Sequence, residues 1–218
     1  MYFASRVQAG RMLANRLYDK YRYENCVVLA LNEGGVIVGS QIAVKLHCLI
    51  NLLMISDIVL PRETEAVAGI TANGSMIYNK KYSSGQIEEF QQDYFNLIEQ
   101  EKLSKMRDMN RLVGMGGTVK KNFLKGHHII IVSDGLPSGF HLDLAAEFLK
   151  PINIESIVVA VPFASVKAVD RMHVLADDLY CLNVVSDYIS TDHYYDQNNV
   201  PEKKEIIEAI EKIILNWH

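Results

Sequence analysis

Short apolar runs alternate with amphipathic stretches along most of the chain, and this pattern predicts an α/β fold. Five runs of aliphatic and β-branched residues show little polar alternation, which is typical of strands buried on both faces of a parallel sheet. They cover residues 26–31, 48–55, 127–132, 156–162 and 178–185. Because helical patterns separate these runs, we expect a mainly parallel central sheet with helices on both faces.

The helices are predicted by apolar residues at helical spacing. They cover residues 5–22, 36–47, 140–149, 165–175 and 201–217. Ser165 is placed to cap one helix, and Pro201 suits the first turn of the last.

The region 62–118 departs from this alternation. Asn73 and Gly74 stand between two short apolar runs, which is a strong hairpin signal. Residues 84–112 carry one long helical pattern. We expect this region to be an insertion beside the sheet, with residues 1–218 forming a single domain.

Composition narrows the class of protein. The chain has 218 residues, of which 49% are hydrophobic and 22% charged, as in ordinary globular proteins. Its net charge of -4 argues against a nucleic-acid polymer or an anionic membrane as partner. No signal peptide is recognisable, and no apolar stretch approaches the ~20 residues that span a bilayer. We therefore expect a cytoplasmic protein. Its three scattered cysteines suggest neither a disulfide framework nor a metal site.

Two glycine-containing turns follow predicted strands, and ligands of open parallel sheets bind beyond the carboxyl ends of the strands. One turn contains Gly34 and Gly35; the other runs through Asp134, Gly135, Leu136, Pro137, Ser138, Gly139 and Phe140. A carboxylate there can accept hydrogen bonds from ribose hydroxyls, while amides at a helix start and a serine hydroxyl can donate to phosphate. The alternative is an ordinary turn whose glycines supply positive φ angles.

The run IIIVSDGLPSGFH resembles the phosphoribosyl diphosphate-binding signature of type I phosphoribosyltransferases. VVLALNEGGVIVGSQIAVKL resembles the segment around Pro-Arg-Gly-Gly in a bacterial branch of that family, and further matches follow in order over nearly the whole chain. The resemblance implies a phosphoribosyl or nucleotide ligand, with Asp134 as the catalytic residue. Gly34, Gly35 and the residues from Gly135 to Phe140 would contact the ligand.

The departures from the family pattern remove charges that the transfer reaction uses. Glu33 replaces the arginine of Pro-Arg-Gly-Gly, Ser133 replaces one of two acidic residues, and Ser56-Asp57 aligns with an Arg-Lys pair. An anion in place of a cation repels pyrophosphate. Activity of this glycosyltransferase class would require Mg²⁺, although we predict no residues as metal ligands. Whether the chain is an enzyme stays open.

Three interpretations follow. The chain is a divergent phosphoribosyltransferase with weak activity, a catalytically inactive protein that binds a nucleotide or phosphate for regulation, or a protein-interaction module. A homodimer is one assembly that the last interpretation allows. Tyr188, Tyr194 and Tyr195 either stack on a nucleobase or pack in the interior.

Overall fold

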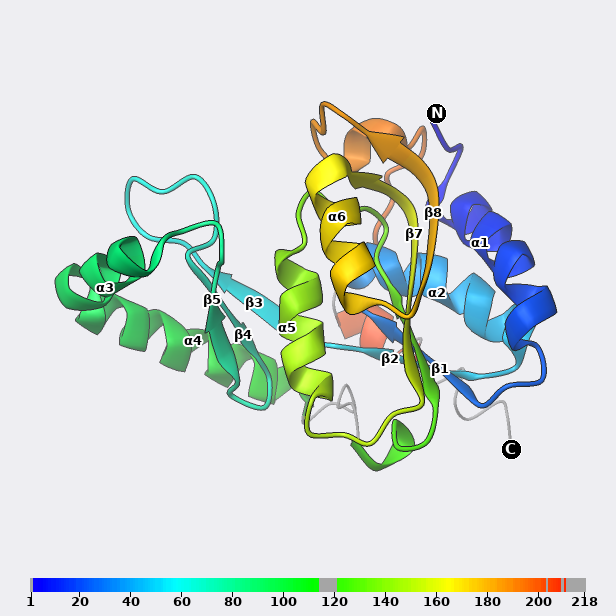
Figure 1. The fold of residues 1–218 in the computed structure, drawn as a ribbon, viewed down its shortest axis with the longest axis horizontal. Helices are drawn as coiled ribbons and strands as arrows, with labels where there is room; N and C mark the ends of the chain where they lie inside the picture. The colour runs from blue at the N-terminus through cyan, green and yellow to red at the C-terminus, as the bar shows by residue number, and fades with distance from the viewer. Residues whose placement is uncertain (1, 114–120, 203, 209, 211–218) are drawn as a thin grey trace.

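A five-stranded parallel sheet forms the centre of the computed structural model, which describes residues 2–113, 121–202, 204–208 and 210 (Figure 1). The strand order is β2-β1-β6-β7-β8, and every neighbouring pair is parallel. The strands are β1 (Cys26–Ala30), β2 (Leu49–Leu52), β6 (His128–Val132), β7 (Ser156–Ser165) and β8 (Asp178–Val185). The predicted α/β fold with a parallel sheet is confirmed.

Helices cover both faces of this sheet, as the alternation of the sequence predicts. The helices are α1 (Arg6–Tyr21) and α2 (Glu33–Leu46) on one face, and α5 (Phe140–Leu149) and α6 (Val166–Leu175) on the other (Figure 1). Along β1, Val28 packs with α1 and α2, while its neighbour Val27 packs with α5 and α6. Successive side chains of a strand point to opposite faces, so the uninterrupted apolar strands feed two cores.

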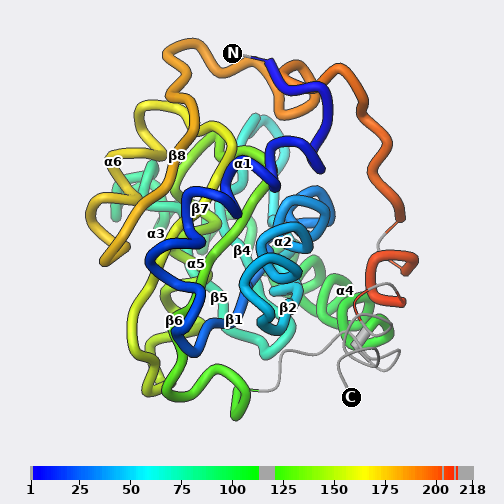
Figure 2. Tube along the Cα trace, turned by 90° about the vertical axis from the view of Figure 1, so that its right-hand side faces the viewer, coloured from blue at the N-terminus to red at the C-terminus, as the bar shows by residue number. Residues whose placement is uncertain are grey.

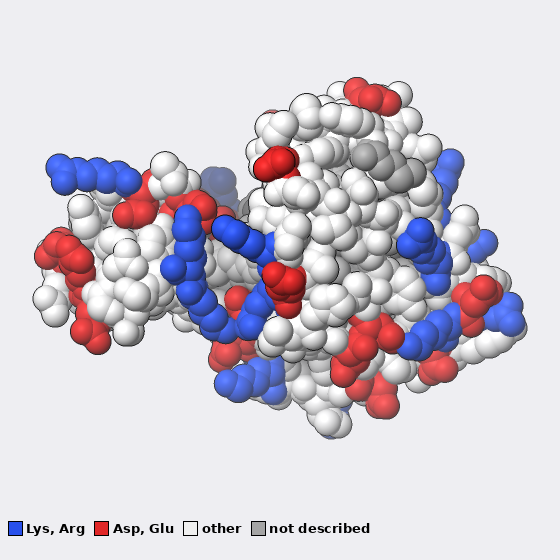
Figure 3. Space-filling model, turned by 45° about the horizontal axis from the view of Figure 1, so that its top comes forward, with Lys and Arg blue, Asp and Glu red and all other residues white. Residues whose placement is uncertain are grey.

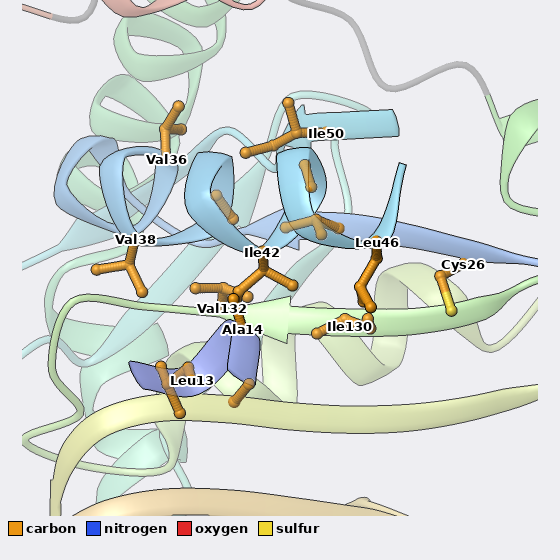
Figure 4. Packing of buried hydrophobic residues seen from close by; sticks show 14 of the residues in the cluster. Leu13, Ala14, Cys26, Val36, Val38, Ile42, Leu46, Ile50, Ile130 and Val132 are labelled. Atoms are coloured by element: carbon orange, nitrogen blue, oxygen red, sulfur yellow. The ribbon is translucent and has the colours of Figure 1, made fainter. Parts of the chain in front are cut away.

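The core beneath α1 and α2 is closely packed. Ile42 of α2, Val132 of β6 and Ala14 of α1 lie together in Figure 4, and all three are buried. Gly10 allows the two helices to approach, because a Cβ atom there would lie 2.6 Å from the carbonyl oxygen of Val38. A side chain at this position would separate α1 from α2.

A smaller antiparallel sheet and two helices form an arm beside the parallel sheet (Figure 1). Its elements are β3 (Ile55–Ile58), β4 (Ala68–Thr71), β5 (Met76–Tyr78), α3 (Ser84–Asp93) and α4 (Phe95–Val113). The hairpin predicted around Asn73-Gly74 is confirmed, and Gly74 has the positive φ of 85° that its turn requires.

Two predicted elements need correction. The apolar run 48–55 is not one strand, because β2 ends at Leu52 and β3 starts in the other sheet at Ile55. Leu53 and Met54 remain buried while the chain passes between the sheets, so hydrophobicity does not mark the break. The helix expected at 84–112 is interrupted at Tyr94, whose φ of -119° ends α3.

Other predictions hold at least in part. The helix expected at 165–175 is α6, and the Ser165 side chain caps it by accepting a hydrogen bond from the amide of Ala168. Of the helix expected at 201–217, residues 204–208 are helical, whereas 211–217 lie outside the described residues. Among the residues that the structure describes, no helix has the length and apolar character needed to cross a membrane.

Charged side chains of both signs are interspersed over the body and the arm on the face shown in Figure 3. Recognition of a charged ligand therefore depends on the groups that line its own cavity, rather than on a broad field of one sign over this face.

Candidate functional site

The candidate site begins where β1 and β6 end side by side. Ala30 pairs with Val132 in the parallel register, so the residues that follow these strands meet at one edge of the sheet. Asn32 caps α2 by accepting a hydrogen bond from the amide of Gly35 at 2.7 Å. Its side-chain amide donates to Oδ1 of Asp134, also at 2.7 Å. The two predicted glycine turns are thus joined through Asn32.

Asp134 is buried and forms an ion pair with Arg6, the first residue of α1. Nε of Arg6 lies 2.7 Å from Oδ2 of Asp134, and both side chains are about 95% buried. Burial alone would lower the pKa of Arg6, but hydrogen bonds to Asp134 and Asp192 outweigh that effect and raise it above its usual value. A Cβ at Gly34 would collide with the carboxylate of Asp134. Gly34 therefore provides space for this ion pair.

Arg6 is the site residue that sequence reasoning missed. Its position at the start of an amphipathic helix is typical of a solvated charge. Its partner Asp134 is 128 residues away, and no local pattern connects the two. The only available signal was the predicted topology, which places the first helix against the same sheet.

The loop from Gly135 to Phe140 is held against β7, which extends further than the predicted 156–162. Leu136 forms a β-bridge with Ala164, and its amide donates to the carbonyl of Phe163 at 3.1 Å. The hydroxyl of Ser165 donates to the carbonyl of Pro137 at 2.9 Å. The loop is therefore fixed by backbone contacts with a core strand.

The glycines of this loop serve close packing rather than positive φ angles. Among the described residues, the glycines with positive φ are Gly74 and Gly126. A Cβ at Gly135 would lie 2.7 Å from both Phe163 and the hydroxyl of Tyr188, and a Cβ at Gly139 would collide with Arg171. The positive φ angles expected at Gly135 and Gly139 for an ordinary turn are therefore not found, whereas a role in ligand binding stays a prediction.

Only some backbone amides of the loop from Gly135 to Phe140 are free to donate a hydrogen bond to a ligand. Pro137 has no amide proton, the amide of Leu136 is engaged with β7, and the amide of Phe140 donates to the Ser138 hydroxyl at 3.4 Å. Within the described part of the chain, the amides of Ser138 and Gly139 donate no hydrogen bond. Gly139 is the N-cap of α5, so both amides stand at a helix start, where an anion is favoured.

A cavity of 490 Å³ opens over this loop. Its walls come from the loop, from the segment after β8 and from the start of the arm. They are formed by Asp57, Glu65, Ala66, Asn79, Leu136, Pro137, Ser138, Phe140, His141, Tyr188, Ile189, Ser190 and Thr191. Its polar lining combines hydroxyl and amide groups with the carboxylates of Asp57 and Glu65 and the imidazole of His141. The ring of Phe140 is buried and packs beside Gly69 of β4, so it does not fill the cavity.

A second cavity of 170 Å³ lies beside Asn32 and Glu33 at the start of α2; Gly34 and Gly35, which lie in the first turn of that helix, do not line it. Its lining includes the two acidic replacements, Glu33 and Asp57, together with His141. Nε2 of His141 lies 3.0 Å from Oδ1 of Asp57. No lysine or arginine is among the described residues that line either cavity. Carboxylates at this place would repel a pyrophosphate anion, and weak pyrophosphate binding stays a prediction.

The three tyrosines separate into two groups. Tyr188 lines the larger cavity, and its hydroxyl hydrogen-bonds to that of Thr191 at 2.8 Å. Burial raises the pKa of Tyr188 to about 12. Tyr194 and Tyr195 are buried beside Phe3, so they pack in the interior. Of the three rings, Tyr188 is thus the one that lines the cavity.

A Mg²⁺ ion would need free carboxylate oxygens, and the site residues do not supply them in this conformation. Asp134 accepts hydrogen bonds from Arg6 and Asn32, and Asp57 is paired with His141. Among the described residues, no group of three or more His, Cys, Asp or Glu is arranged to hold a metal ion. The Mg²⁺ requirement stays a prediction tied to activity.

Comparisons with known proteins agree with this architecture. The crystal structure of the protein TT1426 from Thermus thermophilus superposes with a TM-score of 0.72 at 24% identity, over 100% of this chain and 99% of that one. Two Mycobacterium tuberculosis proteins, from strains CDC 1551 and H37Rv, are named provisionally as phosphoribosyl transferases. Each is 26% identical over 181 residues. The match spans 83% of this chain but only 40% of those relatives.

The family assignment follows from a match over most of the chain. A model described as the phosphoribosyl transferase domain matches residues 3–198, a range that contains the ends of β1 and β6, both loops and the segment after β8. The resemblance seen in the sequence is thereby confirmed, and the chain belongs to the phosphoribosyl transferase domain family.

Proposed function

We propose that the protein binds a nucleotide or phosphoribosyl ligand in the 490 Å³ cavity and that its transferase activity is weak. The proposal rests on the two chain segments that form walls of this cavity. One wall is the loop at Ser138, whose amide donates no hydrogen bond within the described part of the chain, and the other is the segment from Tyr188 to Thr191. The phosphate would bind at the loop, and the aromatic ring of Tyr188 would contact the base.

Weak transfer is supported by the groups around the smaller cavity. A pyrophosphate leaving group needs cations or a metal ion to stabilise its developing charge. Glu33 and Asp57 stand there instead, with His141 already paired to Asp57. Asp134, the proposed catalytic residue, is engaged by Arg6. These contacts oppose efficient transfer chemistry.

Calorimetric titration with adenosine and guanosine 5′-monophosphate tests the binding. We expect Ser138→Ala to weaken binding by about threefold to tenfold, the effect of losing one hydrogen bond. Ser83→Ala, which removes a cap of α3 in the arm, is the matched control and should leave affinity unchanged. Equal affinity of the Ser138→Ala variant and the wild type would place the phosphate elsewhere.

Activity is tested by pyrophosphate release from phosphoribosyl diphosphate with Mg²⁺ and common purines, pyrimidines or orotate. We expect little or no release. Rapid turnover that Asp134→Asn abolishes would show that the lost charges had been compensated. Absence of both turnover and nucleotide binding would favour the alternative, an interaction module, whose predicted homodimer is checked by sedimentation.

A further inference from the structure

The N-terminal segment and the segment 192–198 are joined into one unit at the edge of the site. The amide of Phe3 donates to the carbonyl of Tyr194, and the amide of Asp196 donates back to Phe3, both at 3.0 Å. The two segments run side by side near the N-terminus in Figure 2. Phe3 and Tyr195 both pack on Phe163 of β7. The unit therefore rests on the strand that also fixes the Gly135–Phe140 loop.

Arg6 connects this unit to Asp134. Its guanidinium group has partners on both sides: Nε binds Asp134, while Nη2 lies 2.6 Å from Asp192 and Nη1 lies 3.3 Å from the side-chain oxygen of Asn198. The guanidinium carbon lies 4.5 Å from the centre of the Tyr195 ring. Arg6 thus forms an ion pair with the Asp134 carboxylate, which by the family resemblance would act on the ligand.

The two halves of this contact differ in exposure. The side chain of Asp134 is 5% exposed, whereas that of Asp192 is 66% exposed. The outer contact is the weaker of the two, because water screens the exposed Asp192 carboxylate while Arg6 and Asp134 are buried. Its loss would remove one of the partners that hold the guanidinium group beside Asp134.

The cavity lies next to this contact along the chain. Tyr188 and Thr191 line the cavity, and Asp192 is the next residue. A Cβ at Gly135, the residue after Asp134, would touch the Tyr188 hydroxyl. A ligand in the cavity would therefore contact residues 188–191, which directly precede the Asp192 that binds Arg6.

We propose that Arg6 controls whether Asp134 is available to a ribose-bearing ligand. In the ligand-free protein the guanidinium group occupies Asp134, and ribose hydroxyls compete with it for the carboxylate oxygens. Only molecules in which Arg6 has left Asp134 can bind the ribose hydroxyls at this carboxylate. The apparent affinity for the ligand is therefore reduced by the fraction of molecules in that form. The inference rests on the proposed function, because it requires a ribose-bearing ligand in the adjoining cavity.

The test uses ribose 5-phosphate as the probe and inorganic phosphate as the probe without hydroxyls. Asp192→Asn weakens the outer hold on Arg6, and Arg6→Gln removes the competing charge. We expect each variant to bind ribose 5-phosphate about tenfold more tightly than wild type, on the order of one charge-assisted hydrogen bond. Binding of inorganic phosphate should not change. Asp196→Asn, in the same exposed segment, is the matched control.

The outcomes separate the two proposals. Unchanged or weaker ribose 5-phosphate binding by both variants, with clear binding by wild type, would overturn the role of Arg6 and leave the proposed function standing. No binding by any protein would overturn both. If Arg6→Gln does not fold because Asp134 is left unpaired, the Arg6→Gln/Asp134→Asn variant restores charge balance. It should bind no more tightly than wild type, since it lacks the carboxylate, and tighter binding by it would also refute the inference.

Discussion

At the scale of single residues, the effect of a substitution depends on the space and the charges around the side chain. Gly10 and Gly85 are both helical glycines, yet their surroundings differ. A Cβ at Gly10 would lie 2.6 Å from a backbone oxygen of α2, whereas at Gly85 no atom beyond the backbone of its own helix and its chain neighbours lies within 4 Å of the corresponding position. The same substitution should therefore have opposite effects at the two sites.

Gly10→Ala should lower the free energy of unfolding by about 1–2 kcal/mol, because forced overpacking outweighs the gain in helix propensity. Gly85→Ala should raise it by up to about 1 kcal/mol, since alanine favours a helix without meeting any atom. Urea unfolding curves measure both changes. Stabilisation by both substitutions would mean that the contact between α1 and α2 is looser than described.

The acidic replacements predict how pyrophosphate binding can be restored. Glu33→Arg with Asp57→Lys should tighten pyrophosphate binding by about tenfold or more in calorimetry, because two repulsions become attractions. Ser133 should be left unchanged, since it is buried and its hydroxyl donates to the carbonyl of Gly135. The control, Glu88→Arg with Glu89→Lys on α3, makes the same change in net charge away from the site. Equal tightening by both pairs would show a nonspecific effect.

The helices differ in how many of their residues are buried. Helix α2 buries residues along most of its length, whereas α3 buries none. Local opening is easier where few apolar contacts must be lost. The arm is therefore expected to open more readily at α3 than the parallel sheet does at its covering helices.

Hydrogen exchange followed by mass spectrometry tests this difference. We expect amides of residues 84–93 to exchange much faster than those of 36–46, by at least about tenfold. Similar protection in both helices would mean that α3 is held by contacts that the structure does not include.

The sequence predicts the parallel sheet well because its signal is local. In the run 127–132, Ile129 and Ile131 pack in one core and Ile130 and Val132 in the other. Such a run is apolar whichever residues pack against it, so it is recognisable from the sequence. The break at Leu53 and Met54 could not be predicted, since Leu52, Leu53 and Met54 are buried in three different hydrophobic clusters and the run stays apolar throughout. Likewise, the Asp134 loop is visible in the sequence, but its pairing with Arg6 depends on a contact across 128 residues.

At the scale of the whole molecule, stability depends on pH through two thiols, of which Cys26 is buried and Cys48 partly buried. Burial raises the pKa of Cys48 from 9.0 to about 12 and that of Cys26 to about 11. A group whose pKa is raised by folding stabilises the protein below its unfolded pKa, and this contribution is lost as the pH rises toward the folded value. Stability should therefore fall above pH 9.

The expected slope is about 1.4 kcal/mol per pH unit for each such thiol between its two pKa values. Cys48→Ala should make the decline shallower between pH 9 and about pH 12, as measured by urea unfolding at several pH values. Wild type and variant with identical slopes would show that the thiol of Cys48 ionises as easily in the folded protein as in the unfolded chain.

The ion contacts of Arg6 also have a consequence for the order in which the protein is made. Its partners Asp134 and Asp192 are 128 and 186 residues further along the chain. Synthesis at about 5–20 residues per second separates Arg6 from Asp192 by roughly 10–40 s. The first helix must wait that long, on the ribosome, for the segment that completes its binding to the sheet. A nascent chain thus completes the contacts of Arg6 only after Asp192 has been made.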